Sequence, residues 1–123
     1  MLTFAELRAA NTSRCARWHP GGVADWPLAE WSNAVTGEFG EACNVIKKLN
    51  RIRDGIVGNK PGETEETLRR ALADELADTL IYLDLLALRA GIDLDLAVIR
   101  KFDAVSIREG FPERLSVKQD GAR

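Results

Sequence analysis

The helical spacing of the apolar residues is the feature that most limits how this chain can fold. Apolar side chains recur every three or four positions along almost the whole sequence, and no stretch alternates apolar and polar residues as a half-buried strand does. The pattern predicts an all-α fold. Its interruptions divide the chain into helices at about residues 3–18, 27–54, 64–90 and 93–110.

Capping and breaking residues support these boundaries. Thr64 suits the N-cap of the third helix, and Gly110 suits the end of the fourth. The glycine-containing segment 55–62 is predicted to be a loop. The length of 123 residues fits a single domain, 1–123, in which about 116–123 form a flexible tail.

Leucines surround much of the third predicted helix, which we therefore expect to be the central and most buried element. The second helix is expected to bury one apolar stripe. The fourth is expected to bury its apolar residues at helical spacing, namely Leu96, Ile99, Phe102 and Val105.

Charge and cysteine content exclude several classes of partner. Lys and Arg total 17 against 19 for Asp and Glu, so a net charge of -2 predicts no binding to nucleic acid polymers or anionic membranes. No run of about 18 apolar residues is long enough to cross a bilayer. Cys15 and Cys43 lie far apart and are predicted to be free thiols, as in a reducing cytosol. We expect a soluble, cytoplasmic protein.

Four carboxylates occupy positions where apolar residues are expected. At about 100° per residue, Glu38 lies within about 20° of Trp31 on the apolar stripe of the second helix, and Glu41 lies about 60° to one side. Glu75 and Asp78 repeat this arrangement on the third helix, where Glu75 lies within about 20° of Tyr82. Each helix therefore directs two acids inward.

Buried carboxylates must be protonated, paired with bases or bound to cations, because an uncompensated buried charge costs several kcal/mol. Of the nearby basic residues, only Lys48 falls close to the Glu41 face, at about 20°. A single lysine does not neutralise four acids. The four carboxylates are therefore candidate cation ligands.

The type of ligand indicates which cation fits. A site made only of carboxylates suits Mg²⁺, with Mn²⁺ as a substitute, and disfavours zinc. A di-iron centre needs Glu-x-x-His pairs, and the single histidine, His19, lies in a predicted loop far from both acidic pairs. Mg²⁺ held by carboxylates suits phosphoryl or nucleotidyl chemistry, because it bridges phosphate oxygens and activates water.

Three segments resemble the MazG-like all-α nucleotide pyrophosphohydrolase family: GEFGEACNVIKK from Gly37, ELADTLIYLDLLA from Glu75 and KFDAVSIREGFPERL from Lys101. The resemblance covers about residues 31–115. It implies a four-helix, MazG-like bundle that assembles as a homodimer or a dimer of dimers. It also implies Mg-dependent hydrolysis of a nucleoside triphosphate to the monophosphate and pyrophosphate, in nucleotide-pool house-cleaning.

The resemblance assigns roles to individual residues. Glu38, Glu41, Glu75 and Asp78 would be the metal ligands, and Glu41, with Glu38, would act on the attacking water. Contacts to the triphosphate, sugar or base are implied for Lys48, Lys101, Tyr82, Asn44, Trp31 and Asp103.

Two positions depart from the family pattern. Gly37 replaces the first acid of the EExxE motif, which leaves one carboxylate fewer. Asp103 stands where family members often have asparagine, and an ionised carboxylate does not donate a hydrogen bond. The missing acid keeps open an alternative function, a nucleotide- or metal-binding helical module with little or no turnover. A purely structural dimerisation bundle is a third possibility.

Overall fold

The computed structural model describes residues 1–116 as four α-helices and one short 3-10 turn, with no strand among them. This confirms the predicted all-α class, and the helix ends agree closely with the sequence prediction. The tail predicted from about residue 116 lies, apart from Ser116 itself, outside the described residues. The elements are α1 (Phe4–Trp18), η1 (Gly22–Asp25), α2 (Leu28–Asp54), α3 (Glu65–Arg89) and α4 (Leu94–Glu109).

Side-chain caps begin two of the helices. Thr3 and Glu6 form a capping box at the start of α1, in which each side chain accepts from the other residue's backbone N–H. Thr64 caps α3 as predicted and accepts from the backbone N–H of Thr67 at 3.2 Å. At the end of α4, Gly110 adopts φ 77°, a left-handed conformation that costs glycine little.

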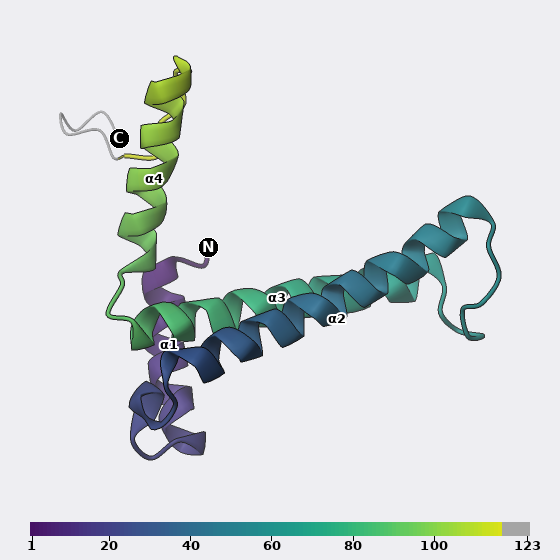
Figure 1. The fold of residues 1–123 in the computed structure, drawn as a ribbon, viewed down its shortest axis with the longest axis horizontal. Coiled ribbons are helices and arrows are strands. Elements are labelled where there is room, and N and C mark those ends of the chain that lie inside the picture. The colour runs from purple at the N-terminus through teal and green to yellow at the C-terminus, as the bar shows by residue number, and fades with distance from the viewer. Residues whose placement is uncertain (117–123) are drawn as a thin grey trace.

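Figure 1 shows that α2 and α3 lie side by side as a long antiparallel arm, joined at its far end by the loop of residues 55–64. α1 crosses the near end of this arm. α4 leaves the same end and extends away from it, with its packing contacts on α1. Within residues 1–116, no helix has both the length and the apolar character of a membrane span.

The core lies where α1 and η1 meet the base of the arm. Cys15, Trp31 and Leu85 are almost completely buried there. Trp31 also donates a hydrogen bond from its indole Nε1 to the carbonyl oxygen of Val23, 2.9 Å away. The buried indole therefore has its partner and connects α2 to η1.

A buried polar cluster fastens α1 to α3. The Asp84 side chain is 1% exposed, and its Oδ1 accepts from Arg8 Nε at 3.1 Å. Its Oδ2 accepts from Asn11 Nδ2 at 3.1 Å. Arg8 also donates to the carbonyl oxygen of Ile92, just before α4. Since each of these charged and amide groups has a partner, the cluster fixes the position of α1 on the arm.

Two of the burial predictions are wrong for the single chain. Leu96 and Phe102 of α4 are 61% and 42% exposed, because α4 extends away from the arm instead of packing along it. α3 is central, but its burial is one-sided, since only the face toward α1 and α2 is covered. Its outer face leaves Leu76, Leu80 and Leu83 exposed.

The Asp84 cluster yields a stability prediction. Asp84→Ala should lower the free energy of unfolding by about 3 kcal/mol, because Arg8 and Asn11 lose their shared buried partner. Urea unfolding followed by circular dichroism measures this. The control is Asp74→Ala, which removes an exposed acid of the same helix and should change the free energy by less than about 0.5 kcal/mol. Equal effects of the two substitutions would contradict a structural role for the cluster.

Candidate functional site

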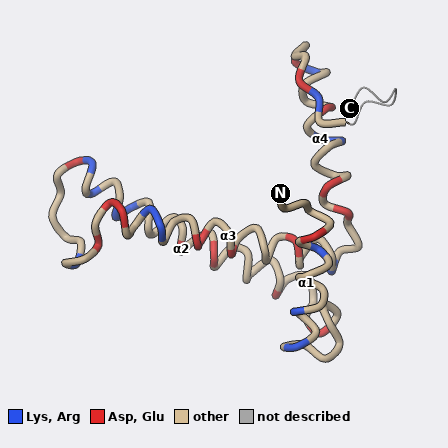
Figure 2. Tube along the Cα trace, turned by 180° about the vertical axis from the view of Figure 1, so that it is seen from behind, with Lys and Arg blue, Asp and Glu red and all other residues tan. Residues whose placement is uncertain are grey.

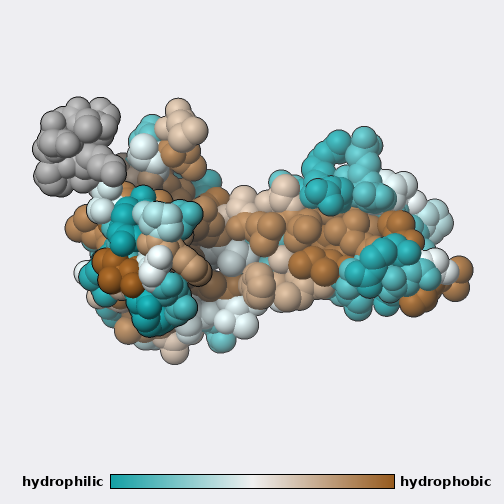
Figure 3. Space-filling view, turned by 90° about the horizontal axis from the view of Figure 1, so that it is seen from above, coloured by the Kyte–Doolittle hydropathy of each residue, from teal (hydrophilic) through white to brown (hydrophobic). Residues whose placement is uncertain are grey.

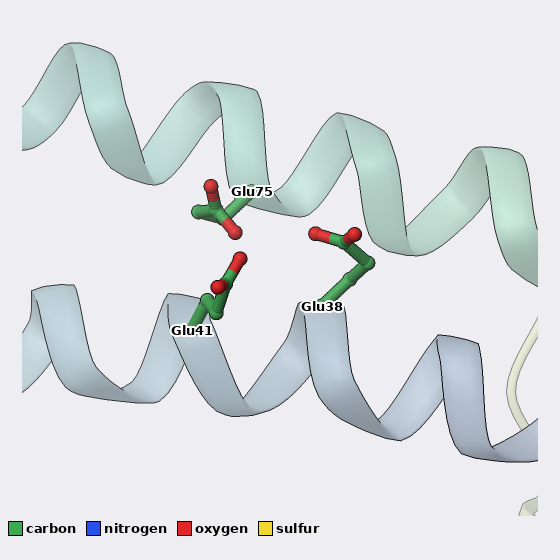
Figure 4. A group of neighbouring side chains, drawn as sticks. All are labelled: Glu38, Glu41 and Glu75. Atoms are coloured by element: carbon green, nitrogen blue, oxygen red, sulfur yellow. The ribbon is translucent and has the colours of Figure 1, made fainter.

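Three of the four predicted acids meet between the two helices of the arm. Glu38 and Glu41 point from α2 toward Glu75 of α3, as Figure 4 shows. One carboxylate oxygen from each of the three lies within 4.8 Å of the others. Glu38 and Glu75 are half-buried, and Glu41 is exposed at the edge. The helical phase of both acidic pairs therefore brings these carboxylates to one place.

The cluster changes the protonation of its members. The pKa of Glu75 is raised from 4.5 to about 7, first by hydrogen bonding to Glu41, then by burial and by the charges of Glu41, Glu38 and Asp78. The pKa of Glu38 is also raised, mainly by burial and by the charge of Asp78. The neighbouring negative charges oppose ionisation of Glu38 and Glu75. A cation between the carboxylates would favour their ionised forms.

The Oε2 atom of Glu75 has no partner. Among the described residues it is the only fully buried side-chain nitrogen or oxygen without a hydrogen bond. Buried carboxylate oxygens are normally satisfied, so this atom points to a missing donor or cation. The donor set, composed only of carboxylate oxygens, fits Mg²⁺ or Mn²⁺.

Asp78 lies one turn after Glu75 on α3, exposed and just outside the group of three. Its charge acts on both Glu75 and Glu38, which places it beside them. Together with Glu38 it also lines the neighbouring cavity. Asp78 therefore stands between the acid cluster and that cavity.

This cavity, of about 300 Å³, lies at the base of the arm and has an aromatic wall. The ring centroids of Trp26 and Trp31 are 4.6 Å apart, and His19 lies edge-on to both, at 4.8 and 5.5 Å. Tyr82 is 6.4 Å from Trp31. The polar side chains of the lining are Glu38 and Asp78 together with Asn11, Arg14 and His19.

Trp31 and Tyr82, which the family resemblance implies as substrate contacts, both lie in the cavity wall. Trp18, His19 and Trp26 line the same cavity and were not predicted from the sequence. Three tryptophans and the single histidine fall between residues 18 and 31. This density of aromatic residues beside an acidic pair was the signal available.

The predicted phosphate-binding residue Lys48 points elsewhere. Its Nζ pairs with Glu63 at 2.5 Å, in the loop after α2, and its backbone carbonyl accepts from Asn59. In Figure 2 the basic residues of the arm gather at the loop end, while acids occupy its middle. Among the described residues, the basic side chain that lines the cavity is that of Arg14.

The remaining predicted substrate contacts lie outside the acid cluster. Asn44 is exposed on α2, and Lys101 is exposed on α4 beside Phe102. Asp103 accepts from the backbone N–H groups of Leu115 and Ser116, at 2.7 and 3.1 Å. These bonds hold the pKa of its carboxyl below the usual range. Asp103 therefore anchors the segment after α4 within the single chain.

Comparison with known proteins gives three curated relatives, while no family model matches the chain. dCTP pyrophosphatase 1 of Rattus norvegicus is 39% identical over 83 residues, which is 68% of this chain and 45% of the relative. The protein of the same name from Homo sapiens is 41% identical over 70 residues, or 57% of this chain and 38% of the relative. dCTP pyrophosphatase 1 of Mus musculus is also 39% identical over 83 residues, which is 68% of this chain and 45% of the relative.

These relatives confirm the resemblance to the MazG-like nucleotide pyrophosphohydrolases. The chain spans less than half the length of each relative that it matches.

The raised pKa of Glu75 predicts how pH affects the metal-free protein. Between its unfolded value of 4.5 and its folded value of about 7, the unfolded chain releases the proton while the folded protein keeps it. Rising pH therefore lowers the free energy of unfolding across this window, and the contribution is constant on either side. Glu75→Gln should remove this loss.

Thermal unfolding in EDTA, from about pH 5 to about pH 8, measures the effect. The melting temperature of Glu75→Gln should exceed that of the wild type by a margin that grows toward about pH 7 and then levels off. Asp74→Asn, an exposed control on the same helix, should follow the wild type. A margin independent of pH would show that Glu75 does not carry the raised pKa.

Proposed function

We propose that this chain is a Mg-dependent nucleoside triphosphate pyrophosphohydrolase, which converts a (d)NTP and water to the monophosphate and pyrophosphate. The observation that carries the proposal is the unpartnered Glu75 oxygen in an acid cluster beside an aromatic cavity. The cavity offers flat rings for a nucleobase, and the acids offer cation ligands for its phosphates. The resemblance to dCTP pyrophosphatases supports the same reaction.

In this proposal Glu38, Glu41, Glu75 and Asp78 hold the metal. When bound, Mg²⁺ neutralises the phosphate oxygens and polarises the phosphorus centre. The base enters the cavity and lies against its aromatic wall, to which Trp26, Trp31 and Tyr82 belong. Glu38 and Asp78 line that cavity at its acidic side, which supports a substrate position with the α-phosphate next to the cluster.

Glu41 is the proposed general base. It lies at the exposed edge of the cluster, where water has access, and its carboxylate is near Glu75. Water attacks the α-phosphorus, Glu41 takes the proton, and the bond from the α-phosphorus to the bridging oxygen breaks. Pyrophosphate leaves with that oxygen and with the electron pair of the broken bond.

Gly37 is the observation that favours a second candidate, a binding module with little turnover. A larger side chain at this position would have open space, since a Cβ added there would meet no neighbouring atom within 4 Å. The fold therefore does not require glycine here, and the family acid is missing for no steric reason. This candidate predicts Mg-dependent nucleotide binding without release of pyrophosphate.

A panel of NTPs and dNTPs with Mg²⁺ tests the activity through pyrophosphate release. Glu38→Gln and Asp78→Asn should each lower kcat/KM by at least about 100-fold, because each removes a charged ligand. Asp74→Asn, an exposed acid one residue from Glu75, serves as the matched control and should keep wild-type activity. No pyrophosphate from any nucleotide would reject the enzyme.

The proposal includes a homodimer formed through the outer face of the arm. Leu28, Phe39 and Ile46 share one face of α2 to within about 20° and are 48%, 50% and 38% exposed. Leu76, Leu80 and Leu83 form a matching exposed stripe on α3. Figure 3 shows a hydrophobic band along the arm, between hydrophilic patches. A second copy of the arm would complete a four-helix bundle.

Sedimentation equilibrium at micromolar concentration tests the dimer. The wild type should sediment at twice the mass of one chain or more, and Leu80→Glu should shift it toward the monomer, because a charge would enter the apolar interface. Arg70→Glu, an equally drastic charge change away from the stripe, should leave the mass unchanged. A monomeric wild type would refute the assembly.

A further inference from the structure

The carboxylate of Glu63 lies in a small cationic cradle at the loop end of the arm. Its Oε2 accepts from Lys48 Nζ at 2.5 Å, and its Oε1 accepts from the backbone N–H of Lys60 at 2.7 Å. These two bonds, that of Lys48 first, hold the pKa of the Glu63 carboxyl below its usual range. An ammonium and a backbone N–H are also the donors with which proteins bind phosphate groups.

Further positive charge surrounds this carboxylate. Arg51 lies one turn after Lys48 on α2, and its Nη1 donates to Asn59 Oδ1 at 3.2 Å. Asn59 in turn donates from Nδ2 to the backbone carbonyl oxygen of Lys48, 2.9 Å away, so the guanidinium stays beside the turn that carries Lys48. The ammonium of Lys60 also acts on the charge of Glu63. In Figure 2 the basic residues of the arm gather at this loop end.

We propose that this cradle is a binding site for a pyrophosphate group, and that Glu63 occupies it as an internal competitor until such an anion displaces it. A pyrophosphate group carries more negative charge than a carboxylate and offers more acceptor oxygens. It therefore suits Lys48, Arg51 and the Lys60 N–H better than the single carboxylate does. The group belongs either to free pyrophosphate or to the end of a nucleoside triphosphate, and for this source the inference rests on the proposed function.

The loop allows Glu63 to leave the cradle. Its side chain is 22% exposed, so water reaches the ion pair with Lys48. Gly62, directly before it, adopts φ 94°, a conformation that costs glycine little. Thr64, directly after it, caps α3 through its own bond from the backbone N–H of Thr67. Displacement of Glu63 therefore breaks its two bonds and leaves the cap of α3 in place.

The cradle is separate from the acid cluster. Lys48 follows Glu41 by seven residues on α2, which corresponds to about 10 Å along the helix axis. The donors of the cradle are nitrogen atoms, whereas the acid cluster offers only carboxylate oxygens, which attract phosphates through a cation. Binding of pyrophosphate to the cradle should therefore need no metal.

Isothermal titration calorimetry with pyrophosphate in EDTA tests the site. Glu63→Gln should bind pyrophosphate at least about tenfold more tightly than the wild type, because the tethered competitor loses its charge. Lys48→Met should abolish binding, and the further change Glu63→Gln should not restore it. If the ion pair were merely structural, Glu63→Gln would lower the melting temperature and leave the affinity at the wild-type value, which would overturn the proposal.

Glu66→Gln is the matched control. Glu66 is an exposed acid in the first turn of α3, so its substitution changes the net charge by the same amount as Glu63→Gln. Its affinity for pyrophosphate should stay close to that of the wild type. An equal gain in both variants would reveal a general effect of net charge and would overturn the proposal.

Nuclear magnetic resonance locates the bound anion. In ¹H–¹⁵N spectra of Glu63→Gln in EDTA, the backbone N–H signal of Lys60 should shift as pyrophosphate is added, because the anion replaces the side chain as its acceptor. The dispersion of the same spectra shows that the variant is folded. Binding that leaves the Lys60 signal unmoved would place the anion elsewhere and overturn the proposal.

Kinetics with Mg²⁺ identify the source of the anion. If the cradle takes the end of the triphosphate, Glu63→Gln should lower KM for the nucleotide. If it takes the released product, the substitution should lower the inhibition constant of pyrophosphate and leave KM unchanged. Unchanged values of both would overturn the proposal. If no nucleotide is hydrolysed, the proposed function fails, while calorimetry in EDTA still decides whether the cradle binds pyrophosphate.

Discussion

The repulsion between carboxylates held in the seam of a two-helix arm is the constraint on which the rest of this structure depends. α2 and α3 pack along their length, and their apolar contacts force Glu38, Glu41 and Glu75 together. The favourable packing of α2 on α3 is therefore opposed by the electrostatic repulsion among these three carboxylates. In the metal-free protein a proton on Glu75 relieves part of this conflict. In the proposed function, a cation held by these acids would relieve it more completely.

The aromatic cavity depends on a separate set of contacts. Its acidic side belongs to α2 and α3, but its opposite wall comes from α1 and from His19 and Trp26, which flank η1. Asp84, Arg8 and Asn11 hold that wall in place. The phosphates of the proposed substrate would thus bind within the arm, and its base would bind between the arm and α1.

The sequence predicts this architecture unevenly, for physical reasons. Helix ends follow from local chemistry, such as the Thr64 cap and Gly110, and the inward acids follow from helical phase alone. The choice of which helices pack against each other does not follow from local chemistry or helical phase. The direction of α4 away from the arm, and hence the exposure of Phe102, depends on contacts that periodicity does not encode. Lys48 has the phase to approach Glu41, but its long side chain pairs with Glu63 of the loop instead.

The Arg8–Asp84 bond joins residues 76 positions apart in the sequence, whereas the arm is a hairpin whose contacts are mostly closer along the chain. Contacts between distant residues pay more loop-closure entropy and tend to form late in folding. We therefore expect the acid cluster to assemble first, as part of the hairpin, and the cavity to close when α1 docks. During folding, the proposed cation site would therefore be complete before the cavity proposed to receive the base.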